Sequence, residues 1–120
     1  MSISVKLYGI PNCNTVKKAR DWLDSHEISY EFHDFKKQGI SEELINNWLK
    51  STDLDSLINK KGTTWRLLTD QEKNKATNIK GSVALMLEKP SVIKRPILIF
   101  KKNLLLGFNV EAYENIFANT

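Results

Sequence analysis

The sequence predicts an α/β fold built on a four-stranded mixed sheet. Two observations carry this prediction. Residues 1–39 show a strand pattern, a helix pattern and a second strand pattern, and residues 96–118 show two more strand patterns and a helix pattern. The stretch between them, about residues 40–90, has helix patterns only, so we expect a helical insert between the second and third strands. No repeat, low-complexity tract or linker interrupts the chain, which predicts one domain over residues 1–120.

The first part of the chain has the order strand, helix, strand. Ile3–Tyr8 alternates apolar and polar residues, as a half-buried strand does, and Gly9 interrupts that pattern. From Asn14 onward, apolar residues recur at helical spacing, and the pattern fades near Ser25–Glu27. Ile28–Phe35 then alternates again, which predicts the second strand.

The insert is predicted to hold several short helices. A helix is expected over Glu42–Lys50, capped by Ser41, and a short helix over Asp53–Ile58, capped by Thr52 or Asp53. A basic loop should follow over Asn59–Arg66. Two more helices are expected over Asp70–Thr77 and Ser82–Leu87, separated near Gly81, and Pro90 should end the insert.

The last part of the chain predicts a hairpin followed by a helix. Pro96–Phe100 is an apolar strand, Lys101–Asn103 a tight turn, Leu104–Phe108 the returning strand, and Val110–Ala118 an amphipathic helix. The first βαβ unit requires parallel strands, and the terminal ββα unit supplies an antiparallel hairpin. Together they predict the thioredoxin-like arrangement, βαβ–ββα, in which the loop after the first strand carries a reactive thiol.

Cys13, the single cysteine, stands at that position. A thiol just before a helix start lies near unpaired backbone N–H groups and the positive end of the helix dipole, which favour its thiolate. Lys17 and Lys18 follow within the next turns and either add positive charge there or form the solvated face of the helix. The alternative is a free cysteine near a turn, but the order strand, loop, thiol and basic helix favours a reactive thiol.

Composition narrows the function classes. The net charge of +4 is moderate and its lysines are scattered, so we expect no direct binding to nucleic acid. His26 and His33 have no metal-ligand spacing, and we expect no metal. A lone cysteine, short apolar runs and no signal-peptide pattern predict a cytoplasmic protein without a membrane segment. We also expect a monomer.

Four segments resemble a known family. They are Tyr8–Arg20, which contains Gly-Ile-x-Asn-Cys-x-Thr, then Gly62–Arg66, Ile93–Pro96 with Lys-Arg-Pro, and Leu105–Phe108. Over nearly its whole length the chain resembles the arsenate-reductase-like (ArsC/Spx) family. Within that family it is most similar to the YffB branch of glutathione-dependent thiol reductases.

The resemblance implies roles for particular residues. Cys13 matches the family's nucleophile, and Arg95 matches an arginine before a proline, Pro96, that is cis in thioredoxin-like folds. The family's second anion-binding arginine falls near Lys60, Lys61 and Arg66, and Lys61 is its nearest match.

Further substrate contacts are expected from Lys17, Asn12 and Thr15, although Asn12 and Asn14 could instead only cap the helix.

Two departures from the family pattern argue against arsenate as the physiological substrate. Arsenate reductases of the family have arginines where this chain has Lys17 and Gly107, and neither residue grips an oxyanion bidentately. Regulators of the Spx type usually carry a Cys-x-x-Cys switch or a variant of it, but here Val16 stands where the second cysteine would be. An internal disulfide is therefore excluded.

With one thiol, a mixed disulfide formed on Cys13 must be resolved from outside the chain. We therefore expect a monothiol reductase whose substrate is a small-molecule disulfide, a protein disulfide or an oxyanion. Glutathione or another small thiol would be its co-substrate, and we expect no tightly bound cofactor. The alternatives are a non-enzymatic Spx-like regulator that binds RNA polymerase or another protein, and a scaffold without turnover.

Overall fold

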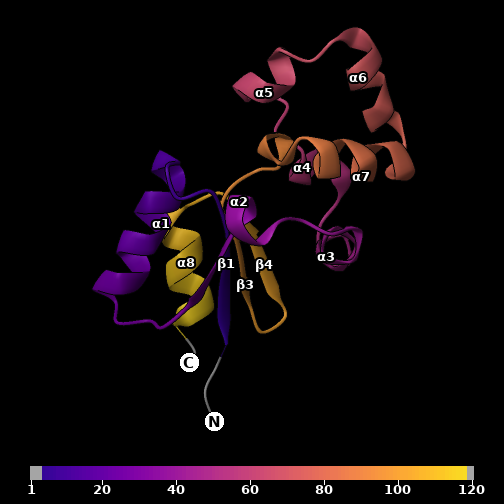
Figure 1. Ribbon diagram of the computed structural model, residues 1–120. Coiled ribbons are helices and arrows are strands. Elements are labelled where there is room, and N and C mark those ends of the chain that lie inside the picture. The colour runs from indigo at the N-terminus through magenta and orange to yellow at the C-terminus, as the bar shows by residue number, and fades with distance from the viewer. Residues whose placement is uncertain (1–3, 119–120) are drawn as a thin grey trace. The chain divides into compact units, whose positions relative to one another are not determined.

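The computed structural model describes residues 4–118. The chain packs as two compact units (Figure 1). The first contains the described residues up to Gly39 together with those from Arg95 onward, and the second is Ile40–Lys94. The second unit covers the stretch in which the sequence predicts a helical insert, and whether both units form a single domain stays a prediction.

A four-stranded mixed sheet forms the centre of the first unit, as predicted. Its strands are β1 (Val5–Gly9), β2 (Glu31–Asp34), β3 (Ile97–Phe100) and β4 (Asn103–Leu106). They lie in the order β2-β1-β3-β4. β1 is parallel to β2 and antiparallel to β3, and β3 is antiparallel to β4. The thioredoxin-like arrangement expected from the element order is therefore confirmed.

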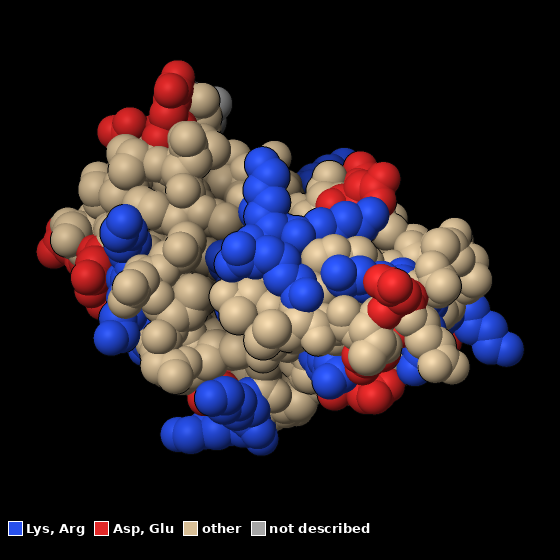
Figure 2. All heavy atoms as spheres, turned by 90° about the horizontal axis from the view of Figure 1, so that it is seen from above, with Lys and Arg blue, Asp and Glu red and all other residues tan. Residues whose placement is uncertain are grey.

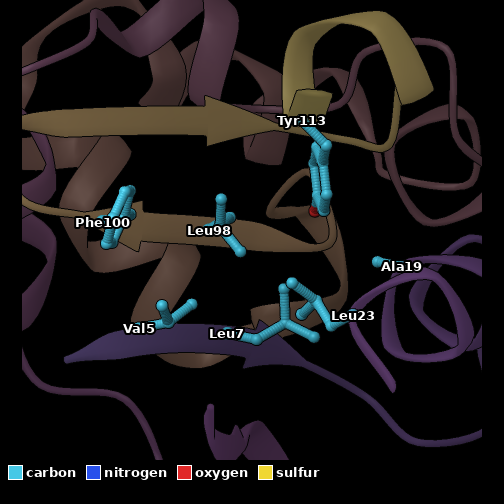
Figure 3. Close-up of a cluster of buried hydrophobic side chains, with 7 residues drawn as sticks. All are labelled: Val5, Leu7, Ala19, Leu23, Leu98, Phe100 and Tyr113. Carbon is cyan, nitrogen blue, oxygen red and sulfur yellow. The ribbon is translucent and has the colours of Figure 1, made fainter. Parts of the chain in front are cut away.

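Two helices, α1 (Asn14–Ser25) and α8 (Val110–Phe117), pack against one face of this sheet (Figure 1). Alternate residues of β1 and β3 point to that face because side chains alternate along a strand. Figure 3 shows the resulting cluster of buried side chains, which contains Val5, Leu7, Ala19, Leu23, Leu98, Phe100 and Tyr113. This cluster fixes α1, and with it the residues just before α1, relative to the sheet.

The second unit is built from short helices. They are α3 (Glu42–Trp48), α4 (Leu54–Leu57), α5 (Thr63–Arg66), α6 (Asp70–Asn74), the 3₁₀ helix η1 (Lys75–Thr77), α7 (Ile79–Glu88) and the 3₁₀ helix η2 (Pro90–Val92). An antiparallel bridge between Ile58 and Ile93, and a 2.7 Å bond from the Asn59 N–H to the Val92 carbonyl, join the segment after α4 to the segment after η2. The predicted caps Ser41 and Asp53 each accept a backbone N–H.

The first two strands are shorter than predicted. Ile3 lies outside the described residues, and β1 begins at Val5. The predicted strand 28–35 is a strand only over Glu31–Asp34, because Phe35–Gln38 forms the short helix α2. The Asp34 carboxylate accepts the Lys36 N–H and the Gln38 side chain accepts the Asp34 N–H, each at 2.9 Å. These side-chain bonds turn the chain out of the strand.

Two expectations within the insert were wrong. Residues 63–66, predicted as loop, form α5, whose turn is closed by bonds from Arg66 and Leu67 to the carbonyls of Gly62 and Thr63. The break expected at Gly81 lies instead at Asn78, whose side chain accepts the Gly81 N–H at 2.7 Å. Gly81 is inside α7, and a Cβ there would overlap the Lys75 carbonyl. The glycine therefore allows close packing and does not end a helix.

Within residues 4–118, every helix is too short or too polar to cross a lipid bilayer.

Candidate functional site

The site begins where β1 passes into α1. Gly9 ends β1, and a Cβ at this position would lie only 2.8 Å from a methyl group of Val16. The missing side chain lets the first turn of α1 approach the end of the strand. The four residues between Gly9 and Asn14 must therefore reverse the chain within a short distance.

Cys13 is the N-cap residue of α1. Its backbone N–H donates to the Ile10 carbonyl at 3.2 Å, which closes the turn, and its carbonyl accepts the Lys17 N–H at 3.0 Å. Its backbone is extended, with φ −92° and ψ 127°, as N-cap residues commonly are. The half-buried thiol thus lies at the helix end where backbone N–H groups lack partners within the helix.

The pKa of the Cys13 thiol is lowered by this environment. Partial burial acts in the opposite direction and raises the pKa, because it disfavours the charged form. The backbone N–H of Val16, the Arg95 guanidinium and the backbone N–H of Thr15 each interact with the sulfur and favour the thiolate, and the charge of Arg95 adds to this. Together these groups outweigh the desolvation.

Arg95 and Pro96 enter the site from the other half of the first unit, just before β3. The peptide bond between them is cis, as the resemblance implied. Pro96 is buried, and its carbonyl accepts the Gly107 N–H at 2.8 Å. That bond joins the segment to the end of the β3–β4 hairpin. The half-buried Arg95 is thereby presented to the thiol by a well-packed backbone.

The other expected contacts of the first unit surround the thiol in sequence. Asn12 and Lys17 are exposed, and Thr15 is half-buried in the first turn of α1. Neither asparagine is the cap, since Cys13 itself holds the N-cap position. Neither Lys17 nor Lys18 contributes to lowering the pKa of Cys13. The positive charge that acts on the thiol comes from Arg95.

Lys61 and Arg66 belong to the second unit. Lys61 is exposed, and its backbone N–H donates to the Asn59 side chain at 3.2 Å. Arg66 is exposed at the end of α5. Their contribution to substrate binding stays a prediction.

The sequence predicts that backbone N–H groups at the helix start favour the thiolate, but it does not single out any of them. The structure identifies those of Val16 and Thr15, which fit because N-cap side chains accept from the second or third N–H of a helix.

The surface carries charges of both signs. On the face shown in Figure 2, lysine and arginine side chains gather in several groups, with acidic side chains among them. Among residues 4–118, no three or more His, Cys, Asp or Glu side chains lie close enough to hold a metal ion.

The chain is similar to several known sequences and solved structures. The model of the ArsC family matches residues 8–116. The solved structure of a protein named YFFB is 40% identical with a TM-score of 0.84, over 92% of this chain and 96% of the other. An arsenate reductase (ArsC) related protein from Brucella melitensis is 42% identical with a TM-score of 0.76, over 98% and 97% of the two chains. The global transcriptional regulator Spx of Streptococcus agalactiae is 28% identical over 107 residues, which are 88% of this chain and 77% of the regulator.

Proposed function

Since this chain belongs to the ArsC family, we propose that it is a thiol-dependent reductase in which the Cys13 thiolate attacks a disulfide or an oxyanion substrate. The observation that carries the proposal is the thiol at the start of α1, with a pKa lowered by the Val16 N–H and by Arg95 against the effect of burial. A thiolate is the nucleophilic form of cysteine, so this environment favours attack near neutral pH.

The reaction with a disulfide would proceed in two exchanges. In the first, the Cys13 sulfur bonds to one substrate sulfur, and the other leaves as a thiolate. In the second, an external thiol attacks the mixed disulfide and releases the Cys13 thiolate. Because Cys13 is the single cysteine of the chain, the second exchange cannot be internal. We infer that glutathione, or another small thiol, supplies it.

Substrate positioning is proposed for the residues around the thiol. Arg95 would hold an anionic group beside the sulfur, and Pro96 fixes the segment that presents Arg95. Asn12, Thr15 and Lys17 lie at the same helix start and would contact the substrate as it approaches.

From the second unit, Lys61 and Arg66 are proposed as further anion contacts. Arsenate is not the proposed substrate, because Lys17 and Gly107 replace the arginines expected of an arsenate reductase.

The test is the intact mass of the protein after exposure to oxidised glutathione. We expect one glutathione adduct, on Cys13, and its removal by reduced glutathione. The same chain in concentrated urea is the matched control, because unfolding removes the helix start and the nearby Arg95 from the surroundings of the thiol. Its adduct should form more slowly at neutral pH. Absence of an adduct on the folded protein under forcing conditions would contradict the proposal.

The similarity to Spx supports a second candidate, a regulator that binds RNA polymerase. Cys13→Ser distinguishes the two candidates. A reductase loses turnover of a small disulfide such as hydroxyethyl disulfide with this substitution, whereas a regulator keeps its binding to purified RNA polymerase. Binding that survives Cys13→Ser, without any turnover by the unmodified chain, would favour the regulator.

A further inference from the structure

One edge of the sheet of the first unit carries main-chain groups that face outward. β2 is the terminal strand in the order β2-β1-β3-β4, and it pairs with β1 on one side only. The Asp34 N–H donates to the Gln38 side chain at 2.9 Å, so it points away from β1. Main-chain groups alternate in direction along a strand. The N–H and carbonyl of Phe32, two residues earlier, therefore also face the outer side.

A groove of about 710 Å³ adjoins this edge. Its lining comes from the second half of α1, from the loop that follows and from the start of β2, and includes Arg20, Asp24, Glu27, Ile28, Tyr30 and Phe32. A strand added beside β2 would direct every second side chain to the face on which this groove lies. The groove thus has the position of a side-chain pocket for an added strand.

The net charge of the groove lining is negative, because the two carboxylates of Asp24 and Glu27 outnumber the guanidinium of Arg20. Arg20 is already engaged, because its guanidinium lies 4.3 Å from the centre of the Phe32 ring and its Nε donates to the Tyr30 hydroxyl at 3.0 Å. Asp24 and Glu27 are exposed and form no ion pair with any residue in the range 4–118. The last turn of α1 has no basic residue, and the carbonyl end of a helix is itself negative. A lysine or arginine side chain complements this groove.

We propose that the outer edge of β2 and its groove bind an extended segment of a partner protein that carries lysine or arginine and adds to the sheet as a fifth strand. This surface is separate from the proposed thiol chemistry and does not rest on it. Cys13 caps the start of α1 and Asp24 lies in its last turn, which places them about 16 Å apart along the helix.

The test uses ¹⁵N-labelled protein and the peptide acetyl-Thr-Lys-Val-Lys-Val-Lys-Thr-amide. We expect the amide signals of Glu31 and Phe32 to shift, hydrogen exchange at the Phe32 amide to slow at least tenfold, and the Cys13 signal to stay in place. A peptide with glutamate for lysine, and one with N-methylated valines, should each bind at least tenfold more weakly. Equal binding of all three peptides, shifts centred elsewhere, or no shift at millimolar peptide would overturn the proposal.

Charge reversal in the groove gives a second measurement. Asp24→Lys combined with Glu27→Lys should weaken binding of the lysine peptide at least tenfold. Asp21→Lys combined with Glu114→Lys is the matched control, since both residues are exposed and neither lines the groove, and it should change the affinity less than twofold. Equal effects of the two changes would contradict the proposal. So would a shift of the Phe32 signal on raising the protein concentration without peptide, because it would identify a second copy as the occupant.

Discussion

At the scale of single residues, the lowered pKa of the Cys13 thiol comes from groups that point at its sulfur. Burial raises the pKa of the thiol, and the Val16 N–H and the Arg95 guanidinium bring it below the ordinary value. The exposed Lys17 and Lys18 are close in sequence but extend into water, where charges are strongly screened. A single oriented arginine therefore has more influence on the thiol than two solvated lysines.

Removing the Arg95 charge tests this explanation. Arg95→Gln should raise the pKa of Cys13, so that alkylation by iodoacetamide at neutral pH slows several-fold and its pH profile moves to higher pH. Lys18→Gln, which removes the same charge from an exposed position, should leave the profile in place. Equal profiles for Arg95→Gln and the unmodified chain would contradict the assigned role.

The same shift has a consequence for stability. A thiol whose pKa is lower in the folded state than in the unfolded state stabilises the fold in its ionised form. This stabilisation grows as pH rises from the folded pKa toward the unfolded pKa, near 9.0, and it is lost as pH falls through the folded pKa. The rise in the free energy of unfolding over that window should be smaller in Arg95→Gln. Urea titrations at several pH values measure it.

Tyr113 provides a second prediction at this scale. Its side chain is fully buried against the sheet, and among the described residues its hydroxyl has no hydrogen-bond partner. Because an unsatisfied buried hydroxyl costs about 1–3 kcal/mol, Tyr113→Phe should leave the free energy of unfolding unchanged or raise it by about 1 kcal/mol. Tyr30→Phe is the contrasting variant, since the Tyr30 hydroxyl accepts from Arg20, and it should lower stability by about 1 kcal/mol. A clear loss of stability in Tyr113→Phe would show that its hydroxyl is bonded in solution.

At the scale of elements, the junction of β1 and α1 determines where the thiol lies. Gly9 lies so close to the Val16 side chain that the end of β1 and the first turn of α1 limit each other's position. The turn closed by Cys13 and Ile10 connects them. The position of the thiol is therefore a property of this junction and not of the loop sequence alone.

Gly9→Ala should disturb this junction. The new methyl group would overlap Val16, so we expect the free energy of unfolding to fall by about 1–3 kcal/mol and Cys13 alkylation at neutral pH to slow. Adding Val16→Ala gives the methyl group room, and the double variant should be more stable than the sum of the two single effects predicts. Additive losses in urea titrations would mean that the two residues are not in contact.

Other elements show where the sequence was insufficient. The apolar pattern from Ile28 continues through Phe35, but the bonds between Asp34, Lys36 and Gln38 replace the strand with α2. The sequence around Gly81 predicts a helix break, but this glycine lies inside α7, where its missing side chain makes room for the Lys75 carbonyl. Both differences arise because a local pattern does not show which backbone groups meet a side chain or another segment.

At the scale of the whole molecule, the chain consists of two compact units of which only the first contains Cys13 and Arg95. The sequence predicts a single domain, and the tryptophans allow a test. Trp22 is in the first unit, whereas Trp48 and Trp65 are in the second.

In Trp22→Phe, tryptophan fluorescence reports the second unit alone, whereas far-ultraviolet circular dichroism reports the whole chain. If the two units unfold together, both measurements should give the same urea midpoint. A fluorescence transition that is resolved from the dichroism transition would show that the second unit unfolds independently. The unmodified chain is the control for any loss of stability caused by the substitution itself.

The sequence by itself determined the four-stranded mixed sheet, its parallel and antiparallel units and the family, because the βαβ and ββα patterns permit few topologies and the motifs around Cys13 and Pro96 are distinctive. It also determined that any mixed disulfide needs an external thiol, since that follows from counting one cysteine. Only the tertiary structure decided which groups act on that cysteine. Residues 13 and 95 are far apart along the chain, and the pKa of a thiol responds to distance and direction in space, which a linear pattern does not contain.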